Sequence, residues 1–112
     1  MKKLLLIILM LMPVVSHAEF FKANQIKEHC FRDGKYHEGL CLGYIMGVHD
    51  GIQLMEESWQ DVKYSICLPN KTKSGELKEV VSNMLENEDL DNMKDKASDI
   101  IWQALLQKFP CK

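Results

Sequence analysis

Apolar residues in this chain repeat every three to four positions, the spacing of one buried face of a helix. This spacing holds in a central stretch from Gly39 to Trp59, in a stretch that begins near Ser74, and in a last stretch that ends at Pro110. A shorter first helix is predicted over 20–30. The three longer stripes consist of Cys41, Tyr44, Ile45, Val48, Ile52 and Met55; Leu77, Val80, Val81, Met84 and Leu85; and Met93, Ala97, Ile100, Ile101, Ala104 and Leu105.

Residues 62–66 are the only strand candidate, and a single strand has no partner with which to form a sheet. Asp33-Gly34 and the polar run 70–75 interrupt the helical pattern, as turns and loops do. The pattern therefore predicts an all-α fold, a small compact bundle of four to five helices around one core.

Four glycines recur every fourth residue on the central helix, at Gly39, Gly43, Gly47 and Gly51. Glycine inside a helix costs about 1 kcal/mol relative to alanine, so the strip needs a reason, and close approach of another backbone supplies one. The partner is either another helix of the same chain or a second copy in a two-fold dimer, and we favour the intramolecular contact. The residues predicted to pack helices are Gly39, Gly43, Tyr44, Ile45, Gly47, Gly51 and Asp50.

The N-terminus reads as an export signal. Lys2 and Lys3 precede an apolar run over 4–15, and Ser16-His17-Ala18 offers small residues for cleavage after Ala18. We expect residues 1–18 to be removed and 19–112 to form one helical domain, with no membrane association after cleavage. A retained anchor is the alternative.

The exported part carries 12 basic residues against 16 acidic ones, because Lys2 and Lys3 lie in the signal. A net charge of −4 gives no electrostatic reason to bind nucleic acid or an anionic membrane.

Cys30, Cys41, Cys67 and Cys111 all lie in the exported part. An even number of cysteines in a short exported chain indicates two disulfides, for which three pairings exist. We favour Cys30–Cys41 and Cys67–Cys111, since the first closes a short turn and the second ties the C-terminus to a loop.

No pattern of catalytic or metal-binding residues stands out. The spacings of His29, Cys30, His37 and Cys41 match no zinc motif, and disulfides leave no free thiol as a nucleophile. His49 and Asp50 are neighbours on a helix and should point in different directions. We therefore predict no metal, no cofactor and no enzymatic activity.

Two acidic segments are candidates for a protein interface. Trp59 combines an aromatic anchor with acidic neighbours, as interface hot spots do, and its equal alternative role is to close the core at a helix end. A second acidic loop follows the next helix. The predicted partner-binding residues are Glu56, Glu57, Trp59, Gln60, Asp61, Glu86, Asn87, Glu88 and Asp89.

Several motifs together resemble one known family. They are C-L-G-Y-I-M-G-V over 41–48 with Asp50, C-L-P over 67–69, L-K-E-V-V over 77–81, Ala104-Leu105, and F-P-C over 109–111. Their order and spacing resemble the Rap/Tai family of immunity proteins, which neutralise type VI secretion amidases.

The resemblance implies a small helical periplasmic protein, commonly dimeric, that inhibits a peptidoglycan amidase toxin similar to cysteine peptidases. It implies that an exposed loop or helix end occludes the active-site cleft of the toxin. The alternative function is a small periplasmic disulfide-bonded chaperone of the acid-stress type, in which His29, His37 and His49 would respond to acid.

Overall fold

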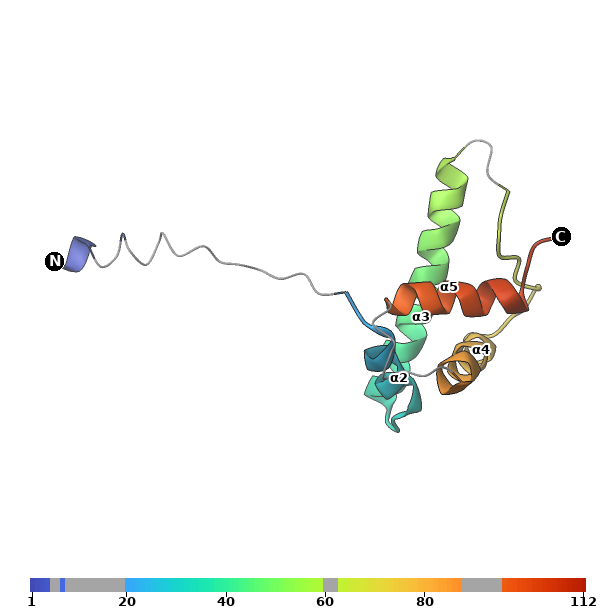
Figure 1. The fold of residues 1–112 in the computed structure, drawn as a ribbon, viewed down its shortest axis with the longest axis horizontal. Helices are drawn as coiled ribbons and strands as arrows, with labels where there is room; N and C mark the ends of the chain where they lie inside the picture. Colours follow the sequence, from blue (N-terminus) through green and yellow to red (C-terminus); the bar gives the residue numbers. More distant parts are fainter. Residues whose placement is uncertain (5–6, 8–19, 60–62, 88–95) are drawn as a thin grey trace.

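A computed structural model describes residues 1–4, 7, 20–59, 63–87 and 96–112. The named helices of these residues are α2 (Ala23–Phe31), α3 (Lys35–Ser58), α4 (Ser74–Asn87) and α5 (Ala97–Lys108). Each of the four contacts the other three, and α5 crosses α3 in Figure 1. The predicted all-α bundle is confirmed. The predicted signal peptide falls largely outside the described residues.

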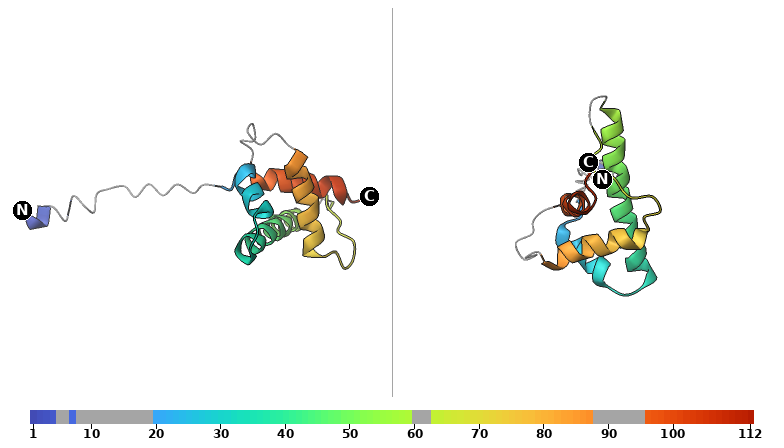
Figure 2. Two further views of the ribbon diagram at one scale, coloured as in Figure 1. Left: turned by 90° about the horizontal axis from the view of Figure 1, so that it is seen from below. Right: turned by 90° about the vertical axis from the view of Figure 1, so that its right-hand side faces the viewer.

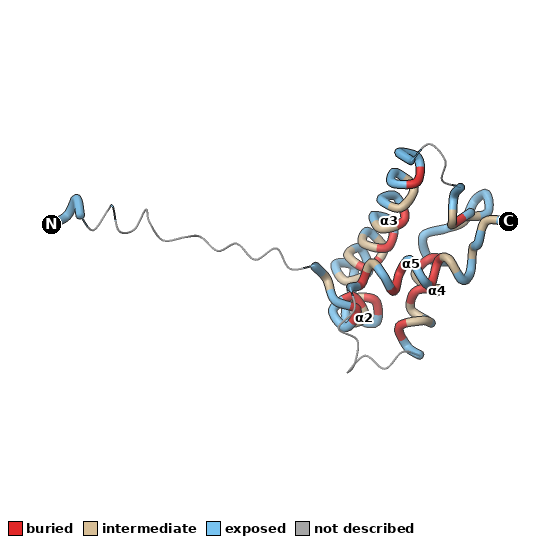
Figure 3. The backbone as a smooth tube through the Cα atoms, turned by 45° about the horizontal axis from the view of Figure 1, so that its top comes forward, coloured by how far each residue is buried: buried red, intermediate tan, exposed pale blue. Residues whose placement is uncertain are grey.

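The core forms where the four helices meet. Fully buried side chains come from every helix: Ile26 from α2, Ile45 from α3, Val81 and Leu85 from α4, and Ile101 and Leu105 from α5. Figure 3 shows these inner faces as buried segments that turn toward one another. The helical periodicity of the sequence thus identifies the core on α4 and α5 directly.

Two predicted helix starts shift. The first helix begins at Ala23 rather than residue 20, because the residues before it pair with the start of α5. The Ala97 N–H donates a hydrogen bond to the Phe21 carbonyl (2.8 Å), and Lys22 forms a β-bridge with Lys96. The central helix begins at Lys35, four residues early, since Gly34 adopts φ +116° and makes the turn just before it. Glycine adopts this backbone conformation readily, whereas residues with a side chain are strained in it.

Both predicted disulfides are present, Cys30–Cys41 between α2 and α3 and Cys67–Cys111 near the C-terminus. The candidate strand also finds a partner, contrary to expectation. Ile66 forms a β-bridge with Pro110, flanked by hydrogen bonds from Cys67 N–H to the Phe109 carbonyl (2.8 Å) and from Cys111 N–H to the Ser65 carbonyl (3.1 Å). The C-terminal residues therefore hold the segment that follows α3.

The predicted intramolecular packing of the glycine strip is wrong for the described part of the chain. Gly39, Gly43, Gly47 and Gly51 are all exposed, and a Cβ added at any of them would meet no described atom within 4 Å. The buried face of α3 lies on the other side, where Cys41, Ile45 and His49 recur at the same four-residue spacing.

The other three predicted packing residues have different places. Ile45 is fully buried, and Tyr44 is half-buried with its ring against Phe21, at a centroid distance of 5.3 Å. Burial, and then the nearby Asp99 carboxylate, raise the pKa of Tyr44. Asp50 is exposed, which contradicts its predicted packing role.

Candidate functional site: the projecting end of α3

The C-terminal end of α3 extends beyond the other helices. Figure 1 and the right-hand view of Figure 2 both show this end standing clear of α2, α4 and α5. Large apolar side chains lie exposed there: Leu54 (66%), Met55 (57%) and Trp59 (66%), with Tyr64 (48%) on the returning segment. Exposed apolar side chains at one end of a helix make this end a candidate surface for a protein partner.

A buried carboxylate fixes the base of this projection. Glu56 is only 7% exposed, and its Oε1 accepts hydrogen bonds from the Ser65 N–H (3.1 Å) and from the Ser65 hydroxyl. Its Oε2 is also buried and has no hydrogen-bond partner among the described residues. Because one carboxylate oxygen accepts hydrogen bonds from both donors of Ser65, Ser65 is held against the end of α3.

The same segment is anchored a second time, two residues later. The Cys67–Cys111 disulfide and the Ile66–Pro110 bridge tie it to the C-terminus directly after Ser65. Glu56 and Ser65 are therefore held in fixed positions, and a surface that is already fixed loses less entropy when it binds a partner.

The predicted partner-binding residues divide into two groups that the structure does not bring together. Glu57 and Trp59 are exposed at the end of α3, whereas Glu56 is buried and positions the segment instead of contacting a partner. Glu86 and Asn87 are exposed at the end of α4, which lies far from the end of α3 in Figures 1 and 2. Gln60, Asp61, Glu88 and Asp89 lie outside the described residues.

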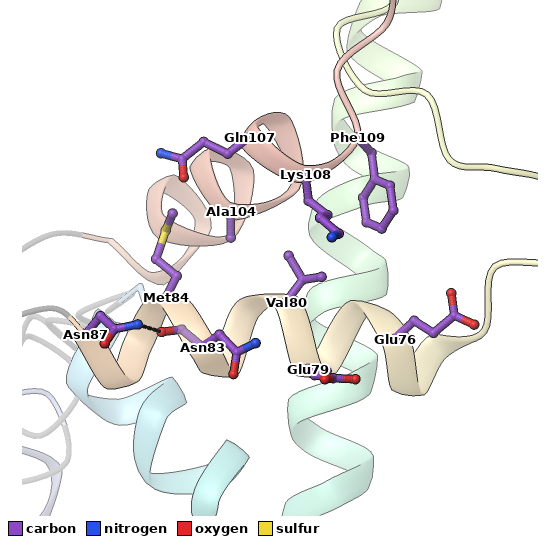
Figure 4. Close-up of a pocket in the computed structure, with 10 residues that line it drawn as sticks. All are labelled: Glu76, Glu79, Val80, Asn83, Met84, Asn87, Ala104, Gln107, Lys108 and Phe109. Atoms are coloured by element: carbon purple, nitrogen blue, oxygen red, sulfur yellow. Dashed lines mark hydrogen bonds between the residues drawn. The ribbon is translucent and has the colours of Figure 1, made fainter.

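An open groove of about 700 Å³ lies between α4 and α5. Figure 4 shows Val80 of α4 facing Ala104 and Lys108 of α5 across it. Met84 and Phe109 add apolar surface, while Glu76 and Glu79 place carboxylates on one side. Since Lys108 adds the opposite charge, the groove favours no single class of ligand.

The residues that were considered as metal ligands or catalytic groups lie in the following places. Cys30 and Cys41 are joined in a disulfide, while His29 and His37 meet nitrogen to nitrogen. Within the described ranges, no three or more His, Cys, Asp or Glu residues are close enough to hold a metal ion. His49 is 8% exposed, and its Nδ1 lies 3.6 Å from Asp50 Oδ1, so the two side chains approach each other more closely than helix geometry suggested.

Comparison with known proteins agrees with this architecture. A family model described as Rap1a immunity proteins matches residues 22–111, which include all four helices and both disulfides.

The chain belongs to the Rap1a immunity protein family.

Membership of an immunity protein family implies that the chain binds a cognate toxin. No curated protein matches the chain significantly. Among the residues that the structure describes, no helix of this Rap1a family chain is long and apolar enough to cross a membrane.

Sequence reasoning missed the role of Glu56 and the pairing of His29 with His37. The helical period places Glu56 on the same face as Ile45 and His49, and that signal indicates burial. No sequence signal predicts the histidine pair, because its members lie on different helices and their distance depends on the turn between them.

Proposed function

We propose that the protein is a periplasmic immunity protein that inhibits a peptidoglycan amidase toxin delivered by type VI secretion. Membership of the Rap1a family supports an immunity role, and the motif set over 41–111 resembles inhibitors of amidases. The signal-like residues 1–18 and the two disulfides support an oxidising compartment outside the cytoplasm. Residues 19–112 are then the mature inhibitor.

The projecting end of α3 is the surface that occludes the active-site cleft of the toxin. Its exposed Leu54, Met55 and Trp59 carry this proposal, since they are large apolar side chains on a helix end that stands clear of the other helices (Figure 1). Glu57 adds charge at the edge, and the net charge of the mature chain would speed encounter with a basic cleft. Inhibition then consists of excluding substrate and requires no chemistry by the inhibitor.

The direct test uses the purified mature, oxidised protein and an amidase encoded beside its gene, with peptidoglycan as substrate. Excess inhibitor is expected to abolish release of cleaved stem peptides and to form a stable complex in size-exclusion chromatography. Full amidase activity in the presence of excess protein would refute the proposed function.

Trp59→Ala is expected to weaken amidase binding about 30-fold, or about 2 kcal/mol, because a protruding tryptophan is a typical hot spot. Trp102→Ala is the matched control, since Trp102 is also exposed (42%) but lies on α5, away from the projecting end. Titration of amidase activity and calorimetry measure both affinities. Equal affinities of the two variants for the amidase would contradict an interface at the end of α3.

We also propose that two copies associate through the exposed glycine face of α3. The open space at Gly39, Gly43 and Gly47 would let two such helices approach closely, and exposed Met46 and Tyr36 lie along the same helix.

Gly43→Leu tests this dimer. The variant is expected to fold normally, because Gly43 is exposed and a Cβ added there meets no described atom within 4 Å beyond the backbone of α3. It is expected to sediment as a monomer where the wild-type protein sediments as a dimer. Analytical ultracentrifugation measures both states. A wild-type monomer, or a variant that remains dimeric, would contradict the proposed interface.

A further inference from the structure

The two disulfides differ in their access to solvent. Cys30 and Cys41 are both buried, with 6% and 0% of their surfaces exposed. Cys67 is exposed, and Cys111 is half-buried directly before the exposed Lys112. Thiol–disulfide exchange requires a thiolate to reach one of the two sulfur atoms, so its rate depends on access. Of the two bonds, Cys67–Cys111 is therefore the one that a thiol reagent can attack while the protein stays folded.

The disulfide also joins the C-terminal residues to the segment after α3. Helix α5 ends at Lys108, and the chain beyond it pairs with that segment through the Ile66–Pro110 bridge and the two hydrogen bonds beside it. An isolated bridge is weak without the support of a sheet, and chain ends open locally at low free energy. Once the covalent bond is broken, the C-terminal residues can therefore leave the segment while the helices stay packed.

Ser65 connects this disulfide to the projecting end of α3. Its carbonyl accepts a hydrogen bond from the Cys111 N–H (3.1 Å), and its own N–H donates to Glu56 Oε1 (3.1 Å). Glu56 lies in the last turn of α3, directly after the exposed Met55. Release of Cys111 therefore removes one of the groups that hold Ser65, and with it part of the support for the end of α3.

We propose that the Cys67–Cys111 disulfide is a site of reversible reduction by dithiols, such as those of disulfide reductases, and that its reduction weakens binding of the toxin. The effect on binding rests on the proposed function, whereas the site of reduction does not. The oxidised protein is then the effective inhibitor. Because disulfides form outside the cytoplasm, the chain becomes an effective inhibitor only after export.

The reaction is a thiol–disulfide exchange in two steps. A thiolate of the dithiol attacks Sγ of the exposed Cys67, which forms a mixed disulfide and releases Cys111 as a thiolate that takes up a proton. The second thiol of the dithiol then loses its proton and attacks the dithiol's own sulfur in the mixed disulfide, which releases Cys67. Two electrons and two protons pass to the protein, and the dithiol is oxidised to an intramolecular disulfide.

The first experiment treats the mature, oxidised protein with dithiothreitol in the absence of denaturant and then labels free thiols with N-ethylmaleimide. Peptide mass spectrometry is expected to show Cys67 and Cys111 labelled at least about 10-fold faster than Cys30 and Cys41, which are the control within the same molecule. Equal rates, faster labelling of the buried pair, or no labelling of either pair would overturn the site.

A second experiment follows the end of α3 without any toxin. The chain has two tryptophans, so Trp102→Phe leaves Trp59 as the only one. Selective reduction of Cys67–Cys111 is expected to lower the fluorescence anisotropy of Trp59, because the end of α3 loses support. Cys67→Ser/Cys111→Ser in the same background should show the lower value with and without dithiothreitol. Equal anisotropy of the oxidised and reduced proteins would overturn the connection through Ser65.

Binding of the amidase is measured by calorimetry after dithiothreitol has been removed under nitrogen. The selectively reduced protein is expected to bind at least about 10-fold more weakly than the oxidised one, and Cys67→Ser/Cys111→Ser should bind as weakly. Equal affinities of the oxidised and reduced proteins would overturn the effect on binding. An oxidised protein that does not inhibit would refute the proposed function together with that effect, whereas the labelling experiment still decides the site of reduction.

Discussion

Replacing Cys67 and Cys111 with alanine is expected to lower the free energy of unfolding by about 4 kcal/mol. The bond closes a loop with a sequence separation of 44, and its loss returns the corresponding chain entropy to the unfolded state. The change leaves the core helices in contact, because both cysteines lie outside α2–α5. Urea denaturation of the oxidised proteins, followed by circular dichroism, measures the difference.

The slope of that denaturation curve separates this mechanism from ordinary loss of packing. Without the bond the unfolded chain exposes more surface, so the m value should rise together with the fall in stability. A loss below about 1 kcal/mol, or an unchanged m value, would contradict the entropic account. Because this disulfide also anchors the segment after Ser65, the variant is expected to inhibit the amidase less well than wild type.

Ile101→Ala is expected to cost about 3 to 4 kcal/mol. Ile101 is fully buried at the centre of α5, so truncation removes apolar contacts and leaves a cavity that neighbours such as Leu85 fill only in part. Ile101→Val, which removes one methylene, should cost about 1 kcal/mol. Thermal and urea unfolding give both values.

Gln103→Ala provides the control for Ile101, since Gln103 lies two residues away on the exposed side of the same helix. Its stability should remain within about 0.5 kcal/mol of wild type. If Ile101→Ala behaved like Gln103→Ala, α5 would not pack with the face that the structure shows.

Periodicity predicted α4 and α5 well because each carries one clear apolar stripe against a polar background. Leu77, Val81 and Leu85 are buried on α4 as their spacing requires, and α5 buries Ala97, Ile101 and Leu105. In such helices the hydrophobic effect leaves one choice of inward face.

The central helix was harder because two regular stripes compete on it. Gly43 and Gly47 repeat at the same interval as Cys41 and Ile45. The stripe with Cys41 and Ile45 was correctly assigned to the core, but Met55 of the same predicted stripe is exposed, and the packing partner predicted for the glycine strip is absent among the described residues. A strip without side chains buries little apolar surface, so it gains little by facing the core.

The candidate site depended on contacts that cross the loop after α3. Sequence patterns placed Trp59 at the end of a helix, where the structure shows it exposed. They also predicted that Glu56 contacts a partner, yet its carboxylate is buried and accepts hydrogen bonds from Ser65. The helical period places Glu56 on the buried face with Ile45 and His49, but its contact with Ser65 depends on the fold and has no signal in the sequence.

The separation of the projecting end of α3 from the core has an evolutionary consequence. Folding depends on residues such as Ile26, Ile45 and Leu85, none of which lies at that end. Exposed positions such as Leu54, Met55 and Trp59 can change with little effect on stability, since surface substitutions typically alter it by less than about 0.5 kcal/mol. With the toxin bound at this end, as proposed, one scaffold can follow a changing partner by substitutions at the end of α3 while selection keeps the bundle constant.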